Sequence, residues 1–392
     1  MVIQPEIKHL VGEIHATPLQ TVMEFAGAGS LALFWLHSQG GSSRTILEAV
    51  DRYAALSTVD LLGTQPRRFV VANTARTMAD HAYQRGLRLS AGNAPVVGIG
   101  CTATIASDYV KRGKHGCHVC VMERTRYTQY AITLDKGARD RAEEEALISR
   151  IVLQGLGRAC GLEPALTLNL RNTESLKTSS GAHRDPLDSL LADEVETVTI
   201  HPGGDISTDQ QMAGLAIISG SFDPLHEGHL QLARAAGAHL HRSVVFELPV
   251  LNADKGTIGH TEICRRVGQF RRPWHLVLTR QPLFAEKAVC FRDSVFVIGY
   301  DTAIRLLHAR YYEGDETKTN AALAAIRAAG CHFLVAGRRW QGRFCTLTDL
   351  SIPTGFSDLF EELPEANFRL DTSSSDVRKR IDPNNTSMPD AA

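Results

Sequence analysis

Ser219-Gly-Ser-Phe-Asp-Pro-Leu-His-Glu-Gly-His-Leu230 is the stretch that decides the fold of the C-terminal half. The apolar run Leu215–Ile218 precedes it, and an alanine-rich pattern that favours a helix, 230–238, follows it. A strand, a glycine-containing turn and a helix start in this order create a phosphate site at the helix N-terminus. Helical spacing places His226 and His229 on one face of that start. Paired imidazoles beside exposed backbone N–H groups suit a polyphosphate whose charge grows during a reaction.

Three segments of the C-terminal half carry a family resemblance. Gly220 to His229 resembles the HxGH signature of the nucleotidylyltransferase superfamily. Thr372-Ser-Ser-Ser-Asp-Val-Arg378 resembles the late ISSTxIR motif of that superfamily, with Thr372 in place of the isoleucine. Phe296-Val-Ile-Gly-Tyr-Asp301 resembles the Gly-x-Asp strand end of nicotinamide mononucleotide adenylyltransferases. The three matches occur in the order that the family leads us to expect.

The resemblance implies an α/β fold with a Rossmann-like, doubly wound parallel sheet. It also implies transfer of a nucleotidyl group from a nucleoside triphosphate to a phosphorylated acceptor, with in-line attack at the α-phosphorus and departure of pyrophosphate. Catalytic roles fall on His226, His229 and Arg378. Nucleotide-binding roles fall on Gly220, Ser221, Phe222, Asp223, Gly228, Lys255, Gly299, Asp301, Ser373, Ser374 and Ser375. We expect Mg²⁺ to arrive with ATP, because the chain offers no dedicated carboxylate cage for it.

Several of these residue types also have structural interpretations. A run such as Ser373–Ser375 is typical of a solvated turn, and Lys255 is typical of an exposed loop. Asp301 also fits the cap of a helix that begins at Thr302. The expected substrates are ATP and nicotinamide or nicotinate mononucleotide. A cytidylyl donor, a phosphopantetheine acceptor and a non-catalytic nucleotide-binding regulator remain alternatives.

The amino-acid composition limits the classes to which this protein can belong. The chain has 392 residues, 43% hydrophobic and 22% charged, as expected for a globular protein of two or three domains. A net charge of −1 gives no basic excess for nucleic acid. The apolar runs are shorter than a membrane span, and the N-terminus lacks the pattern of a signal peptide. Eight scattered cysteines fit reduced thiols. We therefore expect a cytoplasmic protein that acts on small molecules.

One cluster, His115-Gly-Cys-His-Val-Cys120, has the spacing of a metal or redox motif. A second ligand pair at zinc-site spacing does not follow it in the sequence. In a strand, the offset of three sends Cys117 and Cys120 to opposite faces. We therefore expect no metal site there.

The pattern of the chain predicts its domains. Residues 1–165 are expected to form an α/β layered domain, 166–210 a linker with one helix at 186–192, 211–382 the nucleotidylyltransferase domain and 383–392 a disordered tail. In the first domain, helices are predicted over 18–36, 57–62, 73–89 and 139–160, and strands over 44–50, 95–100, 117–123 and 128–135. In the last domain, strands are predicted near 215–219, 244–250, 275–279, 294–299 and 331–336.

The first domain resembles the CinA C-terminal family, which includes nicotinamide mononucleotide amidohydrolases. Gly41-Ser-Ser43, Tyr53 and Gly63 match the spacing of that family. Its Glu-Ser-Cys-Thr-Gly-Gly motif falls on Phe25-Ala-Gly-Ala-Gly-Ser30, so Ala26 takes the place of the proposed nucleophile. Alanine has no oxygen or thiol that attacks an amide.

The remnants of that site would be Ser30, Tyr53 and Thr102, and the turn of Gly27, Gly29 and Ser30 would still offer N–H groups to a phosphate. We expect a scaffold that binds a nucleotide or forms a homo-oligomer interface, with a deamidase as the alternative. Both resemblances point to pyridine nucleotides, which favours such an acceptor by analogy.

Overall fold

The computed structural model describes residues 3–109, 112–252, 256–308 and 315–369. Lys255, Ser373, Ser374, Ser375 and Arg378 lie outside the described residues, as does the predicted tail 383–392. The chain divides into two compact units, Met1–Asp185 and Pro186–Ala392. Each unit has its own sheet and its own core.

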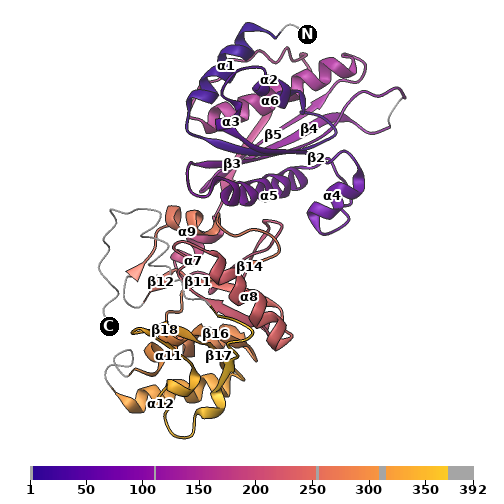
Figure 1. Ribbon diagram of the computed structural model, residues 1–392. Coiled ribbons are helices and arrows are strands. Elements are labelled where there is room, and N and C mark those ends of the chain that lie inside the picture. Colours follow the sequence, from indigo (N-terminus) through magenta and orange to yellow (C-terminus); the bar gives the residue numbers. More distant parts are fainter. Residues whose placement is uncertain (1–2, 110–111, 253–255, 309–314, 370–392) are drawn as a thin grey trace. The chain divides into compact units, whose positions relative to one another are not determined.

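Unit 1 is built on a six-stranded mixed sheet. The strand order is β2 (Ile46–Asp51), β1 (Gln20–Ala26), β3 (Val96–Thr104), β4 (His115–Met122), β5 (Arg126–Leu134) and β6 (Lys177–Ala182). The first three strands are parallel and the others antiparallel. Helices α1 (Pro5–Ala16), α2 (Leu31–His37) and α6 (Arg141–Ala159) cover one face, and α5 (Ala72–Ser90) covers the other (Figure 1). Two short helices, α3 (Ser42–Thr45) and α4 (Ala55–Leu62), flank β2.

The helix predicted over 18–36 is wrong in its first half, which is strand β1. This strand lies between β2 and β3, and its five central residues are buried. A strand buried on both faces lacks the alternation of a half-buried strand, and periodicity does not distinguish the apolar residues of β1, Val22, Met23 and Phe25, from those of a buried helix. The predictions of β2, α4, β3, the hairpin of β4 and β5, and α6 are confirmed.

Helix α5 lies in close contact with β3, and two glycines make this approach feasible. A Cβ added to Gly98 would lie 2.1 Å from the carbonyl oxygen of Ala79, and one added to Gly100 would lie 2.2 Å from that of Ala75. Because the helix numbers fall as the strand numbers rise, α5 runs antiparallel to β3. The start of α5 therefore lies at the carboxyl end of β3.

Unit 2 contains an eight-stranded, mostly parallel sheet. Its order is β20 (Phe360–Leu363), β17 (His332–Ala336), β16 (Val295–Gly299), β10 (Ala216–Ser219), β11 (Val244–Pro249), β14 (His275–Thr279), β7 (Thr197–Ile200) and β8 (Ile206–Thr208). The first six strands are parallel, and β7 and β8 are antiparallel. The five strands predicted for this half are confirmed, as is the α/β class with a Rossmann-like C-terminal domain.

Residues 166–210, expected to be a linker, contain more structure than one helix. The helix is present as α7 (Pro186–Leu191), but β6 belongs to the first sheet and β7 and β8 to the second. Strand β6 is an exposed edge strand with the sequence Lys-Thr-Ser-Ser-Gly-Ala. A polar edge strand carries no apolar alternation, so its sequence pattern resembles that of a loop.

The path of the chain creates a switch point beside β10. From β10 the chain proceeds to β11 and β14 on one side, and it then returns to β16 on the other side. Helices α10 (Phe284–Cys290), α11 (Tyr300–Leu307) and α12 (Glu316–Ala328) pack on one face of the sheet. Right-handed crossovers place α8 (Glu227–Leu240) and α9 (His260–Val267) on the other face. Ligands of such sheets bind at the carboxyl ends of the strands at this point.

Short strands complete the second unit. Strand β9 (Met212–Ala213) pairs with β15 (Phe291–Arg292), β12 (Leu251–Asn252) with β13 (Gly256–Thr257), and β18 (Arg338–Trp340) with β19 (Arg343–Cys345). Among the helices in the described part of the chain, none combines the length and apolar character that crossing a bilayer requires.

Candidate functional site

The turn between β10 and α8 is fixed in place by aromatic packing and by α9. Phe222 is buried, has a φ of +46°, and its ring packs edge-on against Phe246, Phe270 and His229. Arg266 donates to the carbonyl of Ser221 at 2.9 Å, and Gln269 donates to that of Phe222 at 2.9 Å. The carboxylate of Asp223 forms ion pairs with Arg265 and Arg266. Gly220, Ser221, Phe222 and Asp223 thus belong to one rigid turn at the switch point.

The two histidines meet at the first turn of α8. His226 is the N-cap residue, His229 is the third residue of the helix, and Gly228 is buried between them. Their rings stack with centroids 3.8 Å apart and planes inclined by 26°. The backbone N–H of His226 donates to Nδ1 of His229 at 3.2 Å. Because Nδ1 accepts this bond, the proton of a neutral His229 resides on Nε2, which is then a hydrogen-bond donor.

The surroundings keep this pair uncharged. Burial, helped by His226 and Arg338, lowers the pKa of His229 to about 3. Burial and Arg338 also lower the pKa of His226. Two imidazolium rings stacked at this distance would repel each other. At neutral pH His229 therefore acts as a neutral donor.

Arg338 lies close enough to the histidines to lower the pKa of both rings, and it pairs with Asp301. Asp301 is in the first turn of α11, directly after β16, and Gly299 is the N-cap residue of this helix. Oδ1 of Asp301 pairs with Nη1 of Arg338 at 2.8 Å, and Oδ2 pairs with Arg305 at 3.4 Å. Arg338 was missed from the sequence, because it approaches the histidines only through the fold. The site therefore combines His226, His229, Asp301 and Arg338 at the ends of β10 and β16.

A buried polar network underlies the turn, and it too was missed from the sequence. The side chain of Glu247 on β11 is fully buried, and Lys287 on α10 is 3% exposed. Nζ of Lys287 lies 2.8 Å from Oε2 of Glu247 and 2.6 Å from the hydroxyl of Ser219. Ser219 and Thr279 also donate to the Glu247 carboxylate. A glutamate inside an apolar strand was the one signal in the sequence.

The low pKa of His229 predicts a pH effect on stability. Its ordinary pKa is 6.5 and its folded pKa is about 3. Between these values the unfolded chain binds a proton that the folded chain does not, so stability falls as pH falls below 6.5. The loss from one such group is at most about 1.4 kcal/mol per pH unit.

The variant His229→Gln isolates this effect, since glutamine at the third helix position preserves the bond to the N-cap N–H. Thermal unfolding of both proteins between pH 6.5 and 5 should show a steeper loss for the wild type. The interval from pH 6.5 to 5 lies above the range in which Glu174 and Glu262 change stability. The fold lowers the pKa of each of these glutamates from a usual 4.5 to about 2. Equal slopes for the two proteins would contradict the burial of a neutral imidazole.

The three residues of unit 1 that were predicted to remain from a deamidase site lie in different surroundings. Ser30 is exposed at the N-cap of α2, and Tyr53 is 68% exposed. Thr102 is buried and donates to the carbonyl of Phe69 at 3.1 Å. Ala26 is the last residue of β1.

Two further segments of unit 1 were considered as binding sites from the sequence: the turn of Gly27, Gly29 and Ser30, and the cysteine cluster at 115–120. A carboxylate oxygen of Glu145 accepts from the N–H groups of Gly29 and Leu31 at 2.9 and 3.0 Å, so a carboxylate of this chain already occupies that anion position. Cys117 packs in the main core of this unit, and burial raises the pKa of both Cys117 and Cys120 to about 12.

Comparisons with known proteins address both units. Residues 217–380 match the family model described as cytidylyltransferase-like. No curated protein gives a significant match. Solved structures similar to the N-terminal part include the competence/damage inducible protein CihA from Agrobacterium tumefaciens, with 19% identity, 41% of this chain and 98% of that chain covered, and a TM-score of 0.32. A CinA superfamily protein from Escherichia coli has 14% identity, coverage of 41% and 94%, and a TM-score of 0.32.

The matched residues include both the histidine turn and the Asp301–Arg338 pair. The match begins in β10, before the histidine turn, and it includes α11 with Asp301 and β18 with Arg338. The parallel sheet, its switch point and the strand–turn–helix at β10 agree with this match. Residues 217–380 therefore form a cytidylyltransferase-like domain of the nucleotidyltransferase superfamily.

Proposed function

We propose that unit 2 transfers the adenylyl group of ATP to nicotinamide or nicotinate mononucleotide and releases pyrophosphate. The observation that supports this most directly is the neutral, stacked pair of His226 and His229 at the start of α8, with Arg338 beside it. A helix N-terminus, two imidazoles and a guanidinium form a site for a polyphosphate. The choice of a pyridine mononucleotide as acceptor comes from the sequence resemblance.

In the proposed reaction, a phosphate oxygen of the acceptor attacks the α-phosphorus in line. The new P–O bond forms as the bond between the α-phosphorus and the bridging oxygen breaks, and its electron pair leaves with pyrophosphate. The protein positions the reactants and neutralises charge. Nε2–H of His229 donates to a phosphate oxygen, and this bond strengthens as negative charge moves toward the leaving group.

The other residues that the sequence predicted for this site would hold the rest of the substrates. Ser373, Ser374, Ser375 and Arg378 would hold the β- and γ-phosphates, and Lys255 would contact a phosphate. Asp301 would face a ribose and orient Arg338, with which it is paired.

The metal and the cellular setting follow from the same proposal. The two carboxylates assigned to the site, Asp223 in the turn before α8 and Asp301 in α11, are both paired with arginines, so Mg²⁺ would arrive bound to the phosphates of ATP. The reaction would occur in the cytoplasm, and unit 1 would serve in homo-oligomer formation.

The test is pyrophosphate release by the purified full chain with Mg²⁺. We expect release with ATP only after nicotinamide or nicotinate mononucleotide is added. CTP in place of ATP tests a cytidylyl donor, the alternative that the description of the matching family favours. Phosphopantetheine in place of the mononucleotide tests the alternative acceptor. If no donor and acceptor pair released pyrophosphate while ATP still bound, unit 2 would be a non-catalytic nucleotide-binding protein.

A further inference from the structure

A pocket in unit 2 lies at the amino ends of the parallel strands. Its lining includes Leu215, directly before β10, Val244, the first residue of β11, and His275, the first residue of β14. Its volume is about 530 Å³, within the range of sites for small-molecule ligands. The histidine turn follows Ser219, the last residue of β10. The pocket therefore lies at the opposite end of the sheet from the candidate site.

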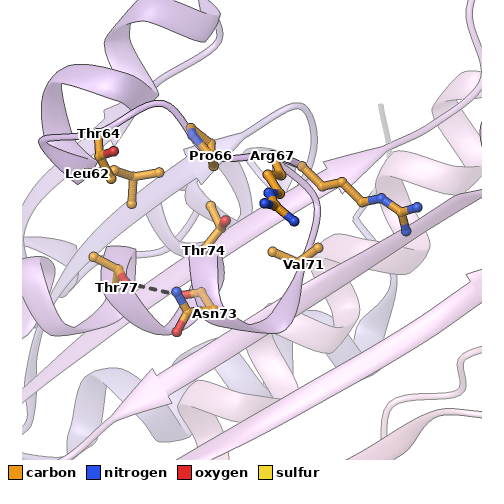
Figure 2. A pocket seen from close by; sticks show the side chains of 9 residues that line it. Leu62, Thr64, Pro66, Arg67, Val71, Asn73, Thr74 and Thr77 are labelled. Atoms are coloured by element: carbon orange, nitrogen blue, oxygen red, sulfur yellow. Dashed lines mark hydrogen bonds between the residues drawn. The ribbon is translucent and has the colours of Figure 1, made fainter.

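The chemistry of the lining indicates which ligands fit. None of the described residues that line this pocket carries a carboxylate, an ammonium or a guanidinium group. A pocket of similar volume in unit 1, about 460 Å³, is lined instead by Arg67 and Arg68 (Figure 2). An ion that leaves water needs a compensating charge, so the pocket in unit 2 favours an uncharged ligand. Its polar groups come from two histidines, two glutamines and a serine: His201, His275, Gln210, Gln211 and Ser243.

The two histidines have defined orientations. Their rings meet edge-on, with centroids 5.4 Å apart and planes inclined by 86°. The hydroxyl of Ser207 donates to Oε1 of Gln210 at 3.0 Å and accepts from Nε2 of His201 at 2.9 Å. Burial and the neighbouring His201 lower the pKa of His275. The ring of His275 is therefore neutral at pH 7, with one donor and one acceptor nitrogen.

Trp274 supplies an aromatic surface to the pocket. Its indole is partly exposed and packs edge-on against Phe246, with ring centroids 5.4 Å apart. Phe246 is buried and packs in turn against Phe222 and Phe270. The indole thus rests on a rigid aromatic cluster. An aromatic side chain held in this way stacks on planar rings at a low entropic cost.

The polar groups match both donors and acceptors of a ligand. A glutamine amide has two N–H donors and a carbonyl acceptor, and the neutral ring of His275 has one of each. A planar nitrogen heterocycle has the complementary features, because its donors and acceptors lie in the ring plane and its faces are free to stack.

We propose that this pocket binds an uncharged, planar nitrogen heterocycle, such as the base of a nucleoside. The ring stacks on Trp274, and its in-plane groups bond to His275 and to the amide of Gln210. The proposal rests on the geometry of the amino ends of the strands, and it does not depend on nucleotidyl transfer at the carboxyl ends.

Hydrogen exchange of the full chain with adenosine, cytidine, nicotinamide or ribose tests this. At least one of the three ring-containing probes should slow exchange of the amides in 211–215 and 243–246, and ribose should not. Adenosine 5′-monophosphate should protect these amides no more tightly than adenosine, because the lining offers the phosphate no cation. Trp274→Leu should weaken the binding by about 10- to 100-fold, the effect of losing one stacking partner.

Two further variants control for folding and for location. Ala213→Phe adds a ring at an exposed lining position and should block the binding without disturbing the aromatic cluster. Trp340→Leu removes the other partly exposed indole of unit 2, which does not line the pocket, and should leave the binding unchanged. The proposal is overturned if no probe protects the two segments, if ribose protects them equally, or if protection is confined to 219–230. Equal binding by the wild type, Trp274→Leu and Ala213→Phe would overturn it as well.

Discussion

Replacing His229 with alanine should slow pyrophosphate release by about 100- to 1000-fold, the effect of losing one donor aimed at developing charge. The ring is neutral, stacked on His226, and has its donor at Nε2. A donor whose bond strengthens only in the transition state lowers kcat, whereas a ground-state contact alone would raise KM. Steady-state rates with saturating ATP therefore separate the two roles.

Two variants control for folding. His229→Gln preserves the helix-start bond to the N–H of His226, so its fold should equal that of the wild type while its rate falls. His239→Ala removes a histidine from the same helix, one whose ring pairs with Glu361, and should leave the rate unchanged. An unchanged rate in His229→Ala, with pyrophosphate release intact, would reject the role assigned to this ring.

The sequence was most informative where structure is local. The twelve residues from Ser219 to Leu230 contain a strand end, a turn and a helix start, and each is encoded by its own neighbours. The histidine pair therefore followed from spacing alone. Arg338 approaches that pair from β18, across the switch point of the sheet, and no local pattern encodes such a contact.

The sequence was least informative where burial or pairing overrides local pattern. Strand β1 has apolar residues on both faces because it lies between β2 and β3 inside the sheet, so its pattern resembled that of a helix. Strand β6 has an exposed polar sequence and pairs with β5 only in the fold. Glu247 and Lys287 are 40 residues apart in the sequence, and Lys287 alone has the character of a surface residue. Their pairing depends on how α10 packs on the sheet.

The buried pair of Glu247 and Lys287 gives the largest expected effect on stability. Lys287→Met should lower the free energy of unfolding of unit 2 by about 3–5 kcal/mol, because it leaves the Glu247 carboxylate buried without its cation. Hydrogen exchange of the amides in β10 and β11 measures this loss within unit 2. Arg234→Met is the matched control, since the Arg234–Glu227 pair is exposed and such pairs contribute about 0–1 kcal/mol.

The double variant Glu247→Gln/Lys287→Met separates the charge from the packing. It removes both charges and keeps amide and methionine side chains of similar volume, so it should recover most of the lost stability. Its pyrophosphate release should nevertheless remain reduced, because Lys287 also donates to Ser219, the residue directly before Gly220. Loss of that bond loosens the turn that carries the histidines. If Lys287→Met cost no more than Arg234→Met, the ion pair would not stabilise the fold, and the positioning role of this pair would be refuted.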